Sequence, residues 1–232
     1  MKWSDLLPAW QACLEEAWEA YCLGNVPIGA AVTNADGQVV ARGRNRLNDP
    51  TAPVHQTCGS QLAHAELNAL LALGLPETDF HAYSLYTSIE PCPQCMGAIY
   101  MSGVRQVYFA GEDAYAGSTN LLGTTPYLMR KPVKVYGPFR GGLAEFASAL
   151  HFEYILRRSS SSPELAGFTH SGPGGLSASR PTESPVIAAG RAVYPRSVAL
   201  AEKLFKDDLA QKWAADGLAA GVAFDKFMEF IT

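Results

Sequence analysis

A histidine, a glutamate and a pair of cysteines are the residues of this chain best suited to chemistry. One residue separates His64 from Glu66, and two residues separate Cys92 from Cys95. An imidazole and two thiolates suit zinc, and three protein ligands leave the fourth tetrahedral position open for water. A carboxylate close to the histidine can act as a base toward that water. The spacing therefore predicts a catalytic zinc site with His64, Cys92 and Cys95 as ligands and Glu66 as proton carrier.

A structural zinc site is the alternative interpretation. Such a site is normally closed by four protein ligands, and Cys58 or His55, which precede His64, would have to supply the fourth. A structural site does not explain the glutamate at position 66. We therefore favour the open, catalytic arrangement.

The composition fits one substantial domain with an extension. The chain has 232 residues, 48% of them hydrophobic, which is thin for two independent domains. Its five cysteines are an odd number, and we expect Cys13 and Cys22 to be buried thiols rather than a disulfide. Unpaired thiols, an N-terminus without an apolar leader and the lack of a run of about 18 apolar residues predict a soluble, cytoplasmic protein.

The balance of acidic and basic residues indicates which kind of molecule the protein binds. Residues 1–156 hold nine Lys and Arg against fourteen Asp and Glu, whereas proteins that grip nucleic acid usually show a basic footprint. Local basic patches remain possible at two places, namely Arg42, Arg44 and Arg46, and Arg130, Lys131 and Lys134. We expect a small-molecule partner, with nucleic acid as the less favoured alternative and no membrane.

Apolar periodicity and turn residues divide the first 156 residues into alternating helices and strands. Helices are predicted over 4–23, 61–73, 93–101 and 143–156, and strands over 29–33, 38–41, 81–88, 104–110 and 133–136. This alternation predicts an α/β fold of three α/β/α layers with a mixed central sheet. Because residues two apart do not share a helix face, we place His64 and Glu66 in a first helical turn, where both can reach one site.

The composition changes at Arg158. We expect a domain that carries the zinc site over 1–157, a linker or draping loop rich in Ser, Gly and Pro over 158–190, and a helical extension over 191–232. The extension should carry one helix over 197–216 and a short apolar stripe over 224–231. It is too short for a domain of its own, so it packs on the core or on a neighbouring subunit, or forms a lid over the site.

The motifs resemble those of the cytidine-deaminase-like superfamily of zinc nucleobase and nucleoside deaminases. Residues 64–66 and 91–95 carry its specific pattern, H-x-E followed by P-C-x-x-C. The region from about 15 to 136 is similar to two bacterial branches, the guanine deaminases and the tRNA wobble adenosine deaminases. Residues 86–88, 90–93 and 97–100 look more like the first branch, and 111–113 and 116–118 more like the second.

The resemblance implies roles for individual residues. It implies zinc ligands at His64, Cys92 and Cys95, a proton shuttle at Glu66, and substrate contacts from Asn45, the backbone amide of Ala65 and Glu90. A turn asparagine that caps a strand is the other interpretation of Asn45. The resemblance also implies a homodimer.

The expected activity is hydrolytic deamination of a free nucleobase or nucleoside, with an aminopurine such as guanine favoured. Conversion of adenosine to inosine in tRNA is the first alternative, and a non-catalytic zinc interaction module is the second. The chain departs from the two branches in an insertion at 53–63 and in everything beyond about residue 157. The insertion is either a surface bulge or a part of the substrate site that brings in His55 or Cys58.

Overall fold

The computed structural model describes residues 1–74, 80–161 and 183–231. A five-stranded sheet with the order β2-β1-β3-β4-β5 forms the centre. Its strands are β1 (Gly29–Thr33), β2 (Val39–Arg44), β3 (Ser84–Ile89), β4 (Gln106–Gly111) and β5 (Lys134–Tyr136). β1 is antiparallel to β2 and β3, whereas β3, β4 and β5 run parallel. The sheet is therefore mixed, as predicted.

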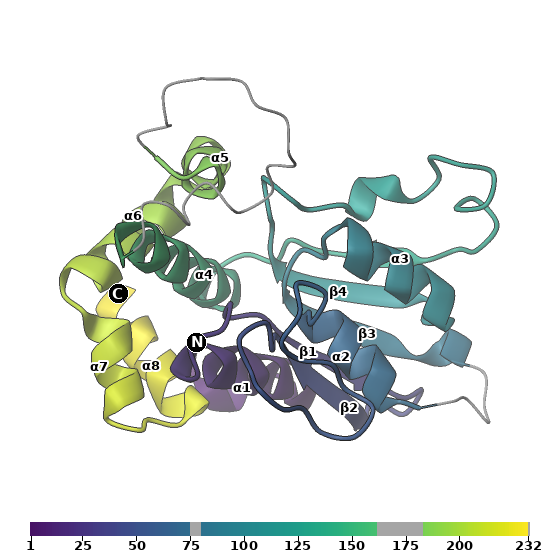
Figure 1. Cartoon of the computed structure of the whole chain (residues 1–232), viewed down its shortest axis with the longest axis horizontal. Coiled ribbons are helices and arrows are strands. Elements are labelled where there is room, and N and C mark those ends of the chain that lie inside the picture. Colours follow the sequence, from purple (N-terminus) through teal and green to yellow (C-terminus); the bar gives the residue numbers. More distant parts are fainter. Residues whose placement is uncertain (75–79, 162–182, 232) are drawn as a thin grey trace.

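Helices cover both faces of this sheet (Figure 1). α1 (Pro8–Cys22) and α4 (Gly142–Ser161) pack on one face, and α2 (Ala65–Ala72) and α3 (Pro93–Ser102) pack on the other. Each face buries its own apolar cluster. The three-layer α/β/α prediction is confirmed.

Several predicted boundaries shift. The first helix begins at Pro8, after a short 3-10 turn at Trp3–Asp5, and α2 begins only at Ala65. β2 continues to Arg44 rather than stopping at residue 41. The alternating arginines after residue 41 did not indicate a buried strand, because a charged residue is usually exposed, whereas Arg44 is buried.

Ion pairs account for the three arginines in and after β2. Arg42 pairs with Glu15 at 2.6 Å, and Arg44 pairs with Asp49 at 2.7 Å. Arg46 also pairs with Asp49, at 2.9 Å. These side chains are thus neutralised locally and do not form the basic patch considered from the sequence.

A glycine allows α2 to lie directly against β2. A Cβ atom added at Gly43 would lie 2.3 Å from the backbone nitrogen of Ala69 and 2.6 Å from the carbonyl oxygen of Ala65. A larger residue would push α2 away from the sheet, since real Cβ atoms do not approach backbone atoms so closely. Gly43 therefore helps to fix the helix whose first turn carries Glu66.

The chain after residue 183 forms four helices beside α1 and α4 (Figure 1). They are α5 (Pro185–Val193), α6 (Pro195–Lys206), α7 (Leu209–Ala215) and α8 (Ala220–Ile231). Phe224 and Phe227 of α8 are fully buried in the same cluster as α1 and α4. The Trp18 indole also donates a hydrogen bond of 2.7 Å to the carbonyl of Leu218. The described part of the extension thus contributes to the core on the side of α1 and α4.

The predicted linker and C-terminal helix need correction. α4 continues through the serines to Ser161, so the linker does not begin at Arg158. α5 begins at Pro185, inside the range predicted for the linker, and continues to Val193. The single helix expected over 197–216 is broken between α6 and α7, where Asp208 has a φ of 55°. Residues 162–182 lie outside the described part of the chain, and the division into three parts stays a prediction.

Two smaller expectations can be compared with the structure. All five cysteines have free thiols, and Cys13 is buried, but Cys22 is exposed at the end of α1. Within the described residues, every helix is too short or too polar to cross a membrane.

Candidate metal centre

Two helix N-termini bring the predicted ligands together beyond the carboxyl end of β3. His64 is the residue just before α2, with extended backbone angles, and Cys92 holds the equivalent position before α3. Pro93 occupies the first position of α3, where its missing N–H costs no hydrogen bond, and Cys95 follows in the first turn. The partial positive charge of helix N-termini favours thiolates at these places.

The three side chains form a compact donor set. The Nδ1 atom of His64 lies 3.4 Å from the Sγ atom of Cys92 and 3.5 Å from that of Cys95. All three donor atoms lie within 4.8 Å of one another. A tetrahedral zinc ion with ordinary bond lengths would hold nitrogen and sulfur ligands about 3.6 Å apart. The donor set therefore fits zinc in both chemistry and spacing.

The pKa values of the two thiols, Cys92 and Cys95, are shifted in opposite directions. A hydrogen bond from Cys95, supported by His64, lowers the pKa of the Cys92 thiol to about 4. The hydrogen bond with Cys92, together with burial, raises the pKa of Cys95 well above its usual range. A bound cation would favour the thiolate of both cysteines. Without a metal, Cys92 is thus the thiolate and Cys95 keeps its proton. Bound zinc would favour loss of the Cys95 proton, so that both cysteines become thiolates.

Glu66 is buried beside the donor set. Only 3% of its surface is exposed, and its Oε2 atom lies 3.3 Å from the Sγ atom of Cys95. Burial, followed by the negative charge of Cys92, raises the pKa of this carboxyl group. A carboxylate held here can accept a proton from a molecule bound at the metal and return it.

Thr87 is a site residue that our sequence analysis did not identify. Its hydroxyl lies 3.2 Å from Oε1 of Glu66 and 3.1 Å from the carbonyl oxygen of Ile89, and the residue is fully buried. Donation to Oε1 would leave Oε2 facing the metal ligands. The available signal was the pair of adjacent polar residues, Thr87 and Ser88, at the carboxyl end of the predicted strand 81–88.

Asn45 and Ala65 lie on adjoining segments. Asn45 follows β2 directly and is 2% exposed, and its side-chain oxygen accepts a hydrogen bond from the amide of Leu47. The next residue, Arg46, donates its amide to the carbonyl of Ala63, which ties this segment to the start of α2. Ala65 is the first residue of α2, so its amide has no partner within the helix. The turn role of Asn45 is thus visible, and a substrate contact stays a prediction.

Glu90 stabilises a loop. Its Oε1 atom accepts hydrogen bonds from the hydroxyl and the amide of Thr119, at 2.5 and 3.2 Å. A Cβ atom at Gly117 would lie 2.2 Å from its other carboxylate oxygen. One oxygen of Glu90 is therefore already engaged, and its predicted contact with substrate remains untested.

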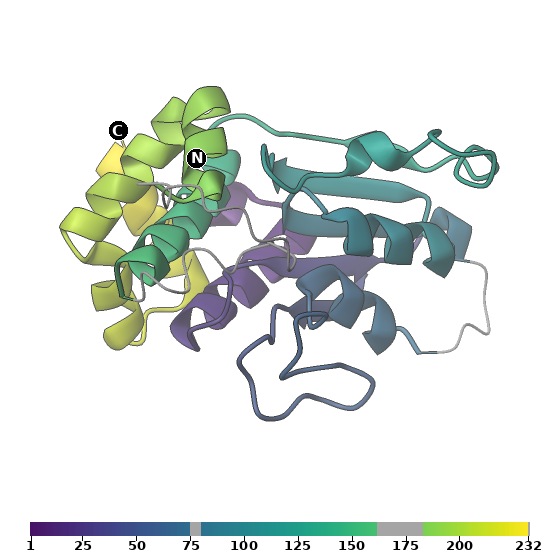
Figure 2. The same cartoon turned by 45° about the horizontal axis from the view of Figure 1, so that its top comes forward.

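The insertion at 53–63 lies in a loop that projects from the molecule between β2 and α2 (Figure 2). Asn68 of α2 holds it, because its side chain exchanges hydrogen bonds with the amide and carbonyl of Thr57. His55 is exposed. Neither His55 nor Cys58 belongs to the three-residue donor group, which is the only such group among the described residues. The closed structural site is therefore not supported.

The family model and two of the curated relatives that this chain matches are all named as deaminases. The family model for the cytidine and deoxycytidylate deaminase zinc-binding region matches residues 4–111. A cytosine deaminase from Candida albicans is 30% identical over 114 residues, which are 48% of this chain and 70% of the relative. A guanine deaminase from Bacillus subtilis is 39% identical over 97 residues, 39% of this chain and 53% of the relative.

Other matches differ in coverage. The chain spans 63% of a tRNA-specific adenosine deaminase from Bacillus subtilis, at 34% identity. It spans only 23% of a tRNA(Ile)-lysidine synthase from Deinococcus radiodurans. A crystal structure of a mutant of the protein NE0047 in complex with 8-azaguanine superposes with a TM-score of 0.50 at 28% identity, covering 63% of this chain and 82% of that one.

Proposed function

Because this chain belongs to the cytidine-deaminase-like superfamily of zinc-dependent hydrolytic deaminases, we propose that it deaminates a free nucleobase or nucleoside, with guanine as the favoured substrate. Water replaces the exocyclic amino group in this reaction, so one C–O bond forms, one C–N bond breaks and ammonia leaves.

The observation that carries the proposal is the buried carboxylate beside an open donor set. His64, Cys92 and Cys95 supply three ligands, and the Oε2 atom of Glu66 lies against them without being needed as a fourth. A non-catalytic zinc module would gain nothing from a buried carboxylate with a raised pKa at this place. Perturbed carboxyl groups of this kind are typical of catalytic sites.

The proposed roles follow from that arrangement. Bound zinc would supply Lewis acidity that makes a water molecule a stronger acid. Glu66 accepts the proton released by the attacking water. It delivers this proton to the ring nitrogen. It then takes the second proton from the hydroxyl group that has added to the ring carbon and passes it to the departing amino group, so the carboxylate is regenerated at the end of each turnover. Thr87 is a positioning residue that holds Oε1 while Oε2 carries the proton.

Three observations support a small aminopurine as substrate. The relatives include a guanine deaminase, and the superposed structure binds 8-azaguanine. The chain as a whole has a net charge of −4, which disfavours tight binding of a polynucleotide at most of its surface. The amide of Ala65 and the side chains of Asn45 and Glu90 are our candidates for contacts with the ring.

The tRNA adenosine deaminase alternative rests on the relative of that name. It requires salt-dependent binding of RNA at the metal centre itself. The arginines nearest α2 are already paired with acids, which supports the small-molecule proposal.

The deciding experiment is a measurement of ammonia release by the zinc-loaded protein. The panel contains guanine, adenine, cytosine, their nucleosides and an anticodon stem-loop. We expect steady turnover of guanine and little on the stem-loop. Activity on the stem-loop alone would favour the tRNA alternative, and zinc binding without any turnover would favour the interaction module.

Replacing Thr87 tests its positioning role. We expect Thr87→Val to lower kcat for ammonia release about tenfold with little change in KM and full zinc content, because a hydrogen bond to a charged group is worth about 1.5–3 kcal/mol. Thr87→Ser keeps the hydroxyl and should recover most of the rate. Wild-type kcat in Thr87→Val would contradict the role.

A further inference from the structure

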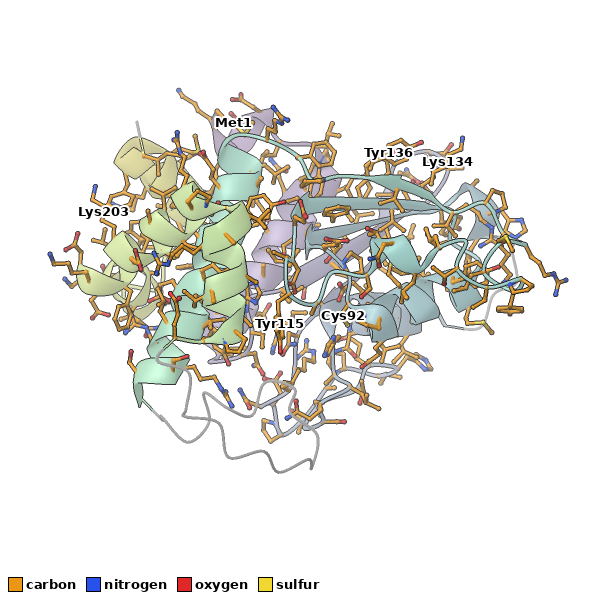
Figure 3. The ribbon with its side chains drawn as sticks, turned by 90° about the horizontal axis from the view of Figure 1, so that it is seen from above. Met1, Cys92, Tyr115, Lys134, Tyr136 and Lys203 are labelled. Carbon is orange, nitrogen blue, oxygen red and sulfur yellow. The ribbon has the colours of Figure 1, made fainter. Side chains whose placement is uncertain are left out.

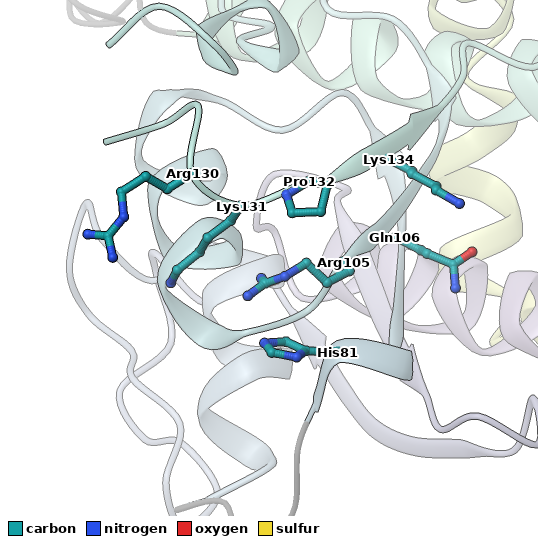
Figure 4. A pocket seen from close by; sticks show the side chains of 7 residues that line it. All are labelled: His81, Arg105, Gln106, Arg130, Lys131, Pro132 and Lys134. Carbon is teal, nitrogen blue, oxygen red and sulfur yellow. The ribbon is translucent and has the colours of Figure 1, made fainter. Parts of the chain in front are cut away.

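A basic pocket lies away from the metal centre. It has a volume of about 610 Å³ and opens at the edge of the sheet formed by β4 and β5. Its lining consists of His81, Arg105, Gln106, Arg130, Lys131, Pro132 and Lys134, which Figure 4 shows from close by. The volume is in the range of ordinary ligand sites, and none of the lining residues in the described part of the chain is acidic.

The permanent charges of this pocket are not neutralised by ion pairs with the described residues. Arg105, Arg130, Lys131 and Lys134 take part in none of the salt bridges among them. The arginines in and after β2, in contrast, are all paired with acids. Four cations without an ion pair to any described residue lie in one pocket of a chain with a net charge of −4. They create a local positive potential that attracts anions.

Two of these side chains are held in place by neutral groups. The ammonium of Lys131 donates a hydrogen bond of 3.2 Å to the carbonyl of Tyr100 and lies over the ring of that residue. The guanidinium of Arg105 donates to the carbonyl of Val104 at 3.1 Å. Figure 4 shows both side chains extending into the same space as His81. Their charge is thus preorganised and still available to a ligand.

The pocket and the metal centre lie at opposite ends of the parallel strands. Gln106 pairs with Ser84 at the start of β3 and β4, whereas Ile89 pairs with Gly111 at their end, shortly before Cys92. Five residue steps along a strand correspond to about 17 Å. Figure 3 accordingly shows Lys134 on a different side of the molecule from Cys92. A nucleobase bound beside Glu66 does not reach this pocket.

Two exposed tyrosine rings lie close to lining cations. Tyr136 is 38% exposed, follows the lining residue Lys134 by two positions on β5, and stacks on Tyr108 of β4 with the ring centres 4.6 Å apart. Tyr127 is 45% exposed, and the guanidinium of the lining residue Arg130 lies 5.9 Å from its ring centre.

We propose that this pocket is a binding site for single-stranded nucleic acid, independent of the small substrate of the metal centre. The cations contact backbone phosphates, and bases stack on Tyr136 and Tyr127. A basic groove with aromatic platforms is the arrangement that binds single strands without sequence preference. Two separate exposed rings favour an oligonucleotide over a mononucleotide, because one base cannot stack on both.

The test measures binding of a fluorescein-labelled 12-nucleotide RNA to the zinc-loaded full chain by anisotropy, over a range of salt concentrations. The Arg130→Gln/Lys134→Gln double variant should bind at least tenfold more weakly. Its salt dependence should fall by about 1.4 in the slope of log Kd against log salt, or about 0.7 for each lost phosphate contact. Tyr136→Ala should weaken binding about 5- to 100-fold, and Tyr136→Phe should bind like the wild type.

Matched controls separate this site from general charge effects. Lys206→Gln/Lys226→Gln makes the same charge change on α6 and α8 and should leave RNA binding intact. Equal losses in both double variants, or no loss in Tyr136→Ala, would overturn the proposal. So would a wild-type Kd above 100 µM at low salt, or displacement of the RNA by GTP at equal concentration.

Ammonia release from guanine is measured in parallel and should not change in the pocket variants. The RNA-binding assay does not depend on turnover, so it still tests the pocket if the protein proves not to deaminate guanine.

Discussion

Glu66→Gln is expected to abolish turnover while the protein keeps its fold and its zinc. Glutamine has nearly the same shape, so it can still fill the buried position next to Thr87. It cannot accept and return a proton. Positioned proton transfer contributes about 10²–10⁴-fold to rate, and a loss of at least that size in kcat is expected because the same carboxylate serves both the attack and the departure of ammonia. Initial rates of ammonia release together with zinc content by mass spectrometry check this.

Glu15→Gln provides the matched control for Glu66→Gln. It makes the same chemical change in an exposed side chain that pairs with Arg42. Surface changes of this kind usually alter stability by less than about 0.5 kcal/mol, so kcat should stay at the wild-type value. A Glu66→Gln protein with more than a tenth of wild-type kcat would show that another group carries the proton.

Cys92→Ala is expected to lose the metal and much of the stability that the metal provides. Removing one of three protein ligands leaves His64 and Cys95, which together hold zinc poorly. A ligand present at 100 times its dissociation constant stabilises the native state by about 2.7 kcal/mol. For a chain of this size, that loss corresponds to a fall in Tm of roughly 5–10 °C. Zinc content after dialysis and thermal unfolding with and without added zinc measure both effects.

Two other cysteines serve as controls for Cys92→Ala. Cys22→Ala changes an exposed thiol, and Cys58→Ala removes the candidate fourth ligand of a closed site. Both variants should keep one zinc per chain and a Tm that responds to zinc as in the wild type. Loss of zinc from Cys58→Ala would contradict the open site and would support a closed structural zinc site with Cys58 as the fourth ligand.

The fold and the metal centre were largely predictable because their signals are local. Alternating apolar patterns located the strands, and the spacing around Cys92 and Cys95 identified a zinc site that α2 and α3 bring together. The burial of Arg44 was not predictable, since it depends on an ion pair with Glu19 of α1, which is distant in sequence, as well as on Asp49.

The details of the C-terminal half depend on tertiary contacts. The serines at the end of α4 favour a linker by composition, but the helix continues through them to Ser161. The break at Asp208 lies where Arg157 of α4 forms an ion pair of 2.9 Å with the Asp208 carboxylate. Thr87 was also missed, because its partner Glu66 lies on another element. Each of these features requires knowledge of which segments meet in space.

The most direct test of the metal centre is X-ray absorption at the zinc edge on the zinc-loaded protein. We predict one nitrogen ligand at about 2.0–2.1 Å and two sulfur ligands at about 2.3 Å, with one further oxygen ligand from outside the chain. This pattern should persist in Glu66→Gln. A shell with three or four sulfur atoms, or one in which Glu66→Gln removes an oxygen ligand, would contradict an open site with Glu66 beside the metal rather than bound to it.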